Sequence, residues 1–173
     1  DGRKLEADVI VVADSANWTT TIPALTTTLR GLVSQVIEVS TLDHALHSGM
    51  YGGAVPDAMT AMIRLLATLH DAEGNVNVAG LKSGKASALD YSDDALATDA
   101  GLLDGVSQIG SGTILDRIWT KPSITVIGMD AVPVAQSSNT MLPTMRAKIS
   151  MRIAPGENPS EALNLLRSHL EAN

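Results

Sequence analysis

The chain has 173 residues, a formal net charge of −7, 45% hydrophobic residues and no cysteine. The negative charge and the absence of lysine–arginine runs argue against a nucleic-acid partner, and no apolar segment is long enough to span a membrane. Without cysteine there are no disulfides and no thiolate metal ligands, which suits a cytoplasmic protein.

The first expected element is a buried strand over residues 7–13. The run ADVIVVA is continuously apolar, as in a strand that is covered on both faces of a parallel sheet. Asp14 follows at the carboxyl end of this strand, where open α/β sheets place ligand sites. From the pattern alone, a turn that Asp14 begins with Ser15 and Asn17 is the simpler interpretation.

A long extended segment is predicted next, over residues 24–40. Val33, Ile37 and Val39 share one of its faces, which predicts a strand with a buried side. Gly31 interrupts the segment, and a glycine inside a strand pattern often marks a bulge.

The loop that follows, DHALHSGMYGG from 43 to 53, is the most informative stretch of the chain. It has three glycines in five residues, and His47 stands ahead of them. Glycines let a backbone adopt positive φ and approach a ligand closely. A histidine can change charge near neutral pH, or donate a hydrogen bond while neutral. A structural histidine in a turn that the glycines shape remains the alternative.

A helix is predicted from Pro56 and Asp57, which suit its first turn, to Gly74, which suits its end. Its apolar stripe is core rather than a cofactor site and comprises Met59, Met62, Ile63, Leu66 and Leu69 or His70. The elements expected after it are a short strand at 75–78, a helix at 93–103 with a solvated acidic face, a helical turn at 114–120 and a strand at 123–129.

Residues 145–153 form the clearest strand pattern, because apolar and polar residues alternate throughout. Asn158, Pro159 and Glu161 then provide a cap, a first-turn proline and a capping-box glutamate for a last helix. His169 near its end is expected to face solvent or the helix C-terminus. The order β, α, β, insertion, β, β, α predicts a two-layer α+β sandwich, an antiparallel sheet with its helices on one face.

Four motifs resemble a known family: VADSANW at 12–18, LRG at 29–31, LHSGMYGG at 46–53 and SMRIAPGENP at 150–159. They are similar to the cytosolic nonspecific dipeptidases and carnosinases of the dinuclear-zinc peptidase family M20. The resemblance covers nearly the whole chain but only the middle of such an enzyme. It implies that residues 1–22 are the last strand and ligand loop of a catalytic domain. Residues 23–173 would then be a ferredoxin-like lid, or dimerisation, domain.

The resemblance also implies a role for particular residues. Asp14 matches a terminal zinc ligand, and His47 matches a histidine that stabilises the oxyanion in the active site of the partner subunit. Arg152 matches the arginine that binds the terminal carboxylate of the substrate, which a guanidinium can grip bidentately. Thr140 matches a small polar residue that orients the substrate, with Asn139 beside it, although the spacing from Thr140 to Arg152 is one residue shorter than in the dipeptidases.

The implied enzyme is a homodimer that hydrolyses small peptides with two zinc ions, or manganese or cobalt in their place. This chain lacks the His-x-Asp motif and the Glu-Glu pair of the family, and Asp14 alone cannot build a zinc site. We therefore expect it to be part of a longer enzyme and to bind no metal tightly by itself. A carboxypeptidase, desuccinylase or aminoacylase of the same family is an alternative. Another is a free-standing ferredoxin-like module that self-associates or binds a ligand without catalysis.

Overall fold

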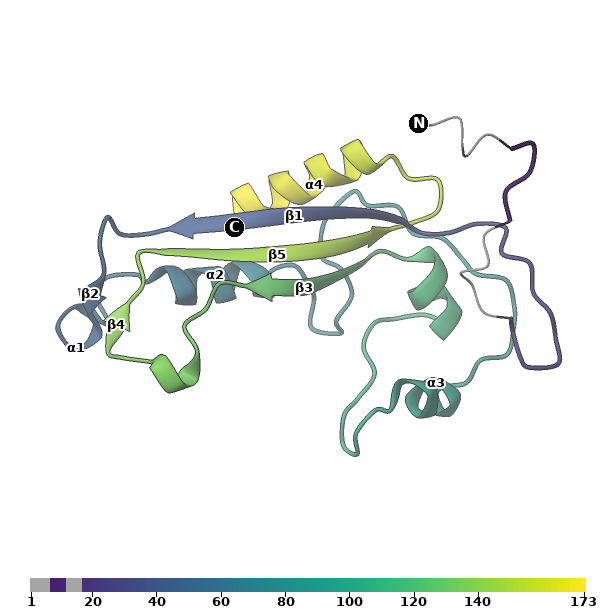
Figure 1. Ribbon diagram of the computed structural model, residues 1–173, viewed down its shortest axis with the longest axis horizontal. Helices are drawn as coiled ribbons and strands as arrows, with labels where there is room; N and C mark the ends of the chain where they lie inside the picture. Colours follow the sequence, from purple (N-terminus) through teal and green to yellow (C-terminus); the bar gives the residue numbers. More distant parts are fainter. Residues whose placement is uncertain (1–6, 12–16) are drawn as a thin grey trace.

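The computed structural model describes residues 7–11 and 17–173, which form a mixed α+β structure (Figure 1). Its strands are β1 (Gly31–Ser40), β2 (Leu46–His47), β3 (Ser123–Met129), β4 (Thr140–Met141) and β5 (Thr144–Ile153). Its helices are α1 (Ser48–Tyr51), α2 (Ala58–Ala67), α3 (Asp93–Ala100) and α4 (Pro159–Ala172), with a π-helical turn at Asp116–Thr120 and a 3-10 turn at Val134–Gln136. No helix of the described part is long and apolar enough to cross a membrane.

The three long strands form an antiparallel sheet in the order β1-β5-β3, with β5 in the middle. Both the antiparallel sheet and the α+β class are as predicted. A second, small pair joins β2 to β4 beyond one end of this sheet (Figure 1). The extended segment predicted over 24–40 is a strand only from Gly31 onward, and the pairing of β1 with β5 begins at this residue.

The predicted bulge at Gly31 is wrong. Gly31 pairs regularly with Ile153, and the irregularity of the sheet lies in β3 between Val126 and Gly128. The glycine is needed for close packing instead: a Cβ at position 31 would lie 2.7 Å from Cγ1 of Ile153. A glycine is therefore needed at position 31 because the Ile153 side chain leaves no space for a Cβ, and not because the backbone bulges there.

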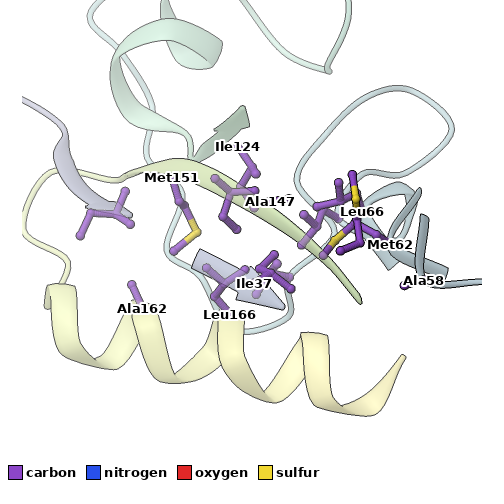
Figure 2. Packing of buried hydrophobic residues seen from close by; sticks show 14 residues of the cluster. Ile37, Ala58, Met62, Leu66, Ile124, Ala147, Met151, Ala162 and Leu166 are labelled. Carbon is purple, nitrogen blue, oxygen red and sulfur yellow. The ribbon is translucent and has the colours of Figure 1, made fainter. Parts of the chain in front are cut away.

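The alternation predicted for β5 is confirmed. Its buried residues are Met145, Ala147, Ile149, Met151 and Ile153. They contact Ala58, Met62 and Leu66 of α2 and Ala162 and Leu166 of α4 in one hydrophobic core (Figure 2). Since the β5 residues of this core all point to the same side, both helices pack on one face of the sheet. The other face carries the polar residues of β5.

Side-chain caps begin both of these helices. The Asp57 carboxylate accepts from the backbone N–H of Thr60 at the start of α2. The Asn158 amide oxygen accepts from the N–H groups of Ser160 and Glu161 at the start of α4. Each cap satisfies donors that the first turn of a helix leaves unpaired.

The predicted α2 stripe is partly wrong. Ile63 is 53% exposed, whereas Met62 and Leu69 are fully buried. Helix α2 ends at Ala67, so the chain has already left the helix when Leu69 enters the core. The predicted strand at 75–78 is reduced to one isolated bridge, between His70 and Val76.

Two further expectations need correction. Residues 7–11 do not form the predicted strand: they are exposed, with Val9 at 78% and Val11 at 86%, and they pair with no strand of the described part. An apolar run becomes a strand only where a partner satisfies its backbone.

His169 does not face solvent alone, because its Nε2 lies 3.0 Å from Oγ1 of Thr68 and so joins α4 to the end of α2.

The insertion between α2 and β3 is held by a buried carboxylate and an aromatic cluster. Asp116, 2% exposed, accepts from the N–H of Ala86 at 2.7 Å. This hydrogen bond is the main reason why the pKa of Asp116 lies below its usual range. Trp18 packs edge-to-face against Tyr91 and Trp119, with ring centroids 6.0 and 5.8 Å apart.

Candidate functional site

His47 lies in a short strand rather than in the predicted loop. It ends β2, pairs with Thr140 of β4, and caps the single helical turn α1. The next N–H, of Ser48, donates to the carbonyl oxygen of Asn139 at 2.9 Å. The structure thus brings three predicted site residues together: His47, Asn139 and Thr140.

The ring of His47 is oriented by its own turn. Its Nδ1 accepts a hydrogen bond from the backbone N–H of Gly49 at 3.1 Å, and the side chain is exposed. An imidazole that accepts at Nδ1 carries its proton on Nε2 when it is neutral. His47 therefore presents an N–H donor at Nε2 to whatever lies in front of the turn.

The glycines after His47 permit this geometry. A Cβ at Gly49 would lie 2.9 Å from Cε1 of His47, and one at Gly52 would lie 2.4 Å from the carbonyl oxygen of Ser48. Gly53 has a φ of +89°, which other residues rarely adopt. Tyr51 between them is 42% exposed. The glycine run therefore shapes the turn and also leaves room for the histidine ring.

Thr140 and Asn139 are exposed beside this turn. The hydroxyl oxygens of Thr140 and Ser138 lie 2.8 Å apart, so Thr140 has a local partner. Asn139 uses its backbone carbonyl to hold Ser48. Both residues lie next to His47: Thr140 pairs with it across β2 and β4, and Asn139 precedes Thr140.

Arg152 lies at the other end of the sheet. It is exposed on β5, opposite Leu32 and Ser123, while the Thr144 end of β5 leads back to β4 and His47 (Figure 1). At about 3.3 Å per residue, the eight steps from Thr144 to Arg152 span about 26 Å. The structure therefore does not bring Arg152 and His47 together.

Asp14, the predicted zinc ligand, lies outside the described residues. Within residues 7–11 and 17–173, no group of three or more His, Cys, Asp or Glu side chains could hold a metal ion. Zinc sites in proteins have at least three protein ligands. The described residues alone therefore do not fit a zinc site.

Sequence reasoning missed one residue near Arg152. Arg30 donates through Nη1 to Oγ of Ser123 at 3.1 Å and to the carbonyl oxygen of Lys121 at 3.3 Å. Its burial, and secondarily the positive charge of Arg152, lower the pKa of Arg30. The LRG motif contains Arg30, but only the fold shows that it lies beside Arg152.

A cavity of about 360 Å³ is lined in part by the insertion but contains none of the predicted site residues. His70, Asn75, Arg117 and Lys121 are among the residues that line it. Its two cations are already engaged, because Arg117 donates to the carbonyl of Ile109 and Lys121 to that of Ser111. We assign it no role in the site.

Comparison with known families and curated proteins gives consistent matches. Residues 27–173 match the family model described as the peptidase dimerisation domain, M20_dimer. A cysteinylglycine-S-conjugate dipeptidase of Corynebacterium striatum is 35% identical over 96% of this chain and 37% of its own length. A Beta-Ala-His dipeptidase of Mus musculus is 26% identical over 95% of this chain and 36% of its own length. The chain thus spans little more than a third of these relatives.

Solved structures share the fold. Human carnosine dipeptidase 1 matches with a TM-score of 0.69 at 24% identity, over 87% of this chain and 34% of that chain. A metallo-carboxypeptidase from Sulfolobus solfataricus matches with a TM-score of 0.66 at 20% identity, over 84% of this chain and 40% of that one. At these identities the likeness is one of fold.

Proposed function

The chain belongs to the peptidase dimerisation domain family of the M20 metallopeptidases, and from this we propose that residues 23–173 are the lid and dimerisation domain of a zinc-dependent dipeptidase. Residues 1–22 then belong to the catalytic domain, as its last strand and ligand loop, with Asp14 as a zinc ligand. The names of relatives that match almost the whole chain support the dipeptidase assignment.

The observation that carries the proposal is the separation of His47 from Arg152. A dipeptide spans at most about 7 Å when extended, whereas Arg152 lies about 26 Å along β5 from Thr144, the end of β5 that leads to β4 and His47. One dipeptide cannot contact both residues of the same chain. If both contact substrate, each serves a different active site. A two-fold homodimer provides this arrangement, because each site then takes one residue from each subunit.

In this proposal, His47 acts as an oxyanion donor. Attack on a peptide carbonyl makes its oxygen negative, and a fixed N–H donor stabilises that charge. The ring of His47 suits this role, because the N–H of Gly49 donates to Nδ1 and leaves Nε2 as the nitrogen that can donate to substrate. Thr140, paired with His47 across β2 and β4, adds a hydroxyl that can orient the substrate at the same site.

Arg152 serves the other site, where it binds the terminal carboxylate. Its guanidinium is exposed and has no ion pair with a described carboxylate, so its donors are available for a substrate. A planar guanidinium matches both oxygens of a carboxylate. Recognition of a free carboxylate near the scissile bond favours short peptides over long ones.

Zinc, when bound, would supply an activated water and a Lewis acid for the carbonyl oxygen. Because the described residues do not form a zinc site, the ions would be held mainly by the catalytic domain. The residues of this chain would then align the substrate and stabilise the charge that develops on it.

The test is a substrate panel for the complete zinc-loaded enzyme. We expect it to hydrolyse dipeptides with a free carboxylate, and to cleave tripeptides, N-acyl amino acids and dipeptide amides much more slowly. A preference for N-acyl amino acids would instead support an aminoacylase or desuccinylase. Release of C-terminal residues from longer peptides would support a carboxypeptidase.

A further inference from the structure

Arg30 reaches across one end of the sheet. It stands immediately before β1, and its Nη1 donates to Oγ of Ser123 and to the carbonyl oxygen of Lys121, at the start of β3. Because β5 lies between β1 and β3, the Arg30 side chain must cross the end of β5 to make these bonds.

The strand register places Arg152 on β5 between the two residues that flank this crossing. Arg152 pairs with Leu32 on one side and with Ser123, the acceptor for Arg30, on the other. The two positive charges interact, which contributes to the lowered pKa of Arg30. Neither arginine forms an ion pair with a carboxylate of the described part of the chain. The ion pairs of lysine and arginine in this part involve other residues.

Two neighbouring guanidinium groups without a counter-ion repel each other, and a bound anion would relieve this repulsion. Toward the described residues, Arg30 donates through Nη1 alone, so within this part of the chain Nη2 and Nε keep donors for a ligand. We propose that Arg30 and Arg152 together form a two-guanidinium site for the terminal carboxylate of the substrate, in which Arg30 is the anchored member. This inference rests on the proposed function of Arg152.

The test compares a dipeptide with its C-terminal amide in the complete zinc-loaded enzyme. Arg30→Gln is expected to lower kcat/KM for the free dipeptide by about tenfold or more, mainly through KM. The same variant should leave kcat/KM for the amide nearly unchanged, since the amide has no charge to bind. Arg30→Lys keeps the positive charge but loses the planar guanidinium. Its kcat/KM for the free dipeptide should lie between the values of the wild type and Arg30→Gln. Lys148→Gln is the control, because Lys148 lies on the same face of β5 but four residues from Arg152, and it should change kcat/KM for neither substrate.

An anchoring role alone predicts another result. If Arg30 only holds the start of β3, Arg30→Gln will lower thermal stability and reduce kcat/KM equally for the dipeptide and the amide, which would overturn the inference. Arg152→Gln in the same assay separates the two proposals. If it discriminates between the substrates and Arg30→Gln does not, only the role of Arg30 is wrong. If Arg152→Gln does not discriminate, the proposed role of Arg152 fails, and the two-arginine site fails with it.

Discussion

At the scale of single residues, the orientation of the His47 ring depends on a neighbour without a side chain. Gly49 provides the N–H that binds Nδ1, and its missing Cβ leaves space for the ring. A residue that donates from Nε2 to a developing charge must be held in place, because misplacement weakens the stabilisation of the transition state. The glycine is therefore part of the machinery that we propose, although it contacts no substrate.

Gly49→Ala tests this. The added Cβ would stand 2.9 Å from Cε1 of His47, so the ring must move. We expect kcat of the complete enzyme to fall by about a hundredfold, the loss that small displacements of reacting groups can cause. Met50→Ala, at a neighbouring position that is 75% exposed, is the control and should leave kcat unchanged. Full activity in Gly49→Ala would show that the orientation of the ring does not matter.

At the scale of elements, the start of α2 couples stability to pH. The N–H of Thr60 is the main reason why the pKa of Asp57 is lowered. A carboxyl group with a lowered folded-state pKa stabilises the fold above its unfolded-state pKa, and this contribution disappears as the pH falls through the folded-state pKa. Acidification should therefore weaken this cap.

The substitution Asp57→Asn separates the hydrogen bond from the charge. Asparagine caps helices about as well as aspartate, so the free energy of unfolding at pH 7 should change little. The variant should lose stability less steeply than the parent chain below pH 4, measured by urea unfolding at a series of pH values. Asp57→Ala should lose about 0.5–2 kcal/mol at neutral pH. Identical acid slopes for the parent and Asp57→Asn would contradict this account.

The two adjacent residues Met62 and Ile63 test the observed face of α2. Met62 is fully buried, whereas Ile63 is 53% exposed. Met62→Ala should cost about 2–5 kcal/mol of unfolding free energy, because it removes buried atoms and leaves a cavity. Ile63→Ala should cost less than about 1 kcal/mol. Chemical denaturation of the two variants measures the difference, and equal losses would show that α2 is packed differently.

Local sequence patterns correctly predicted the elements that are determined by residues close together in the sequence. The strict alternation of β5 and the Asn158 cap of α4 depend on neighbours in sequence, and both are as predicted. Features that depend on residues far apart in the sequence could not be predicted from local patterns. Gly31 is set by Ile153 across the sheet, and His47 enters a strand only because Thr140, far along the chain, pairs with it. Residues 7–11 have a strand pattern without a partner among the described residues.

The candidate site still rests on the sequence resemblance, and the fold adds the positions of its residues. The sequence resemblance identified His47 and Arg152 as candidates, but it did not indicate how far apart they lie. That separation follows from the register of β5 and from the β2–β4 pair at its far end. Arg30 was missed because its relation to Arg152 arises only from the strand order.

At the scale of the whole molecule, our proposal needs two chains for each active site, because His47 and Arg152 of one chain lie too far apart to contact the same dipeptide. Each domain in our account serves two active sites, its own through Arg152 and that of its partner through His47. Dissociation of the dimer should therefore abolish activity even if each subunit stays folded and keeps its metal. The dimer would then be part of the catalytic site.

The most direct measurement is complementation between two inactive subunits of the complete enzyme. His47→Ala should lower kcat by about a hundredfold to a thousandfold, as for other oxyanion donors, and Asp14→Ala should be inactive through its metal site. After subunit exchange at equal concentrations, verified by native mass spectrometry, half of the dimers are mixed. One of the two sites in each mixed dimer is intact, so about a quarter of the wild-type activity should return. If mixed dimers form and no activity returns, His47 does not act across the dimer and the account is wrong.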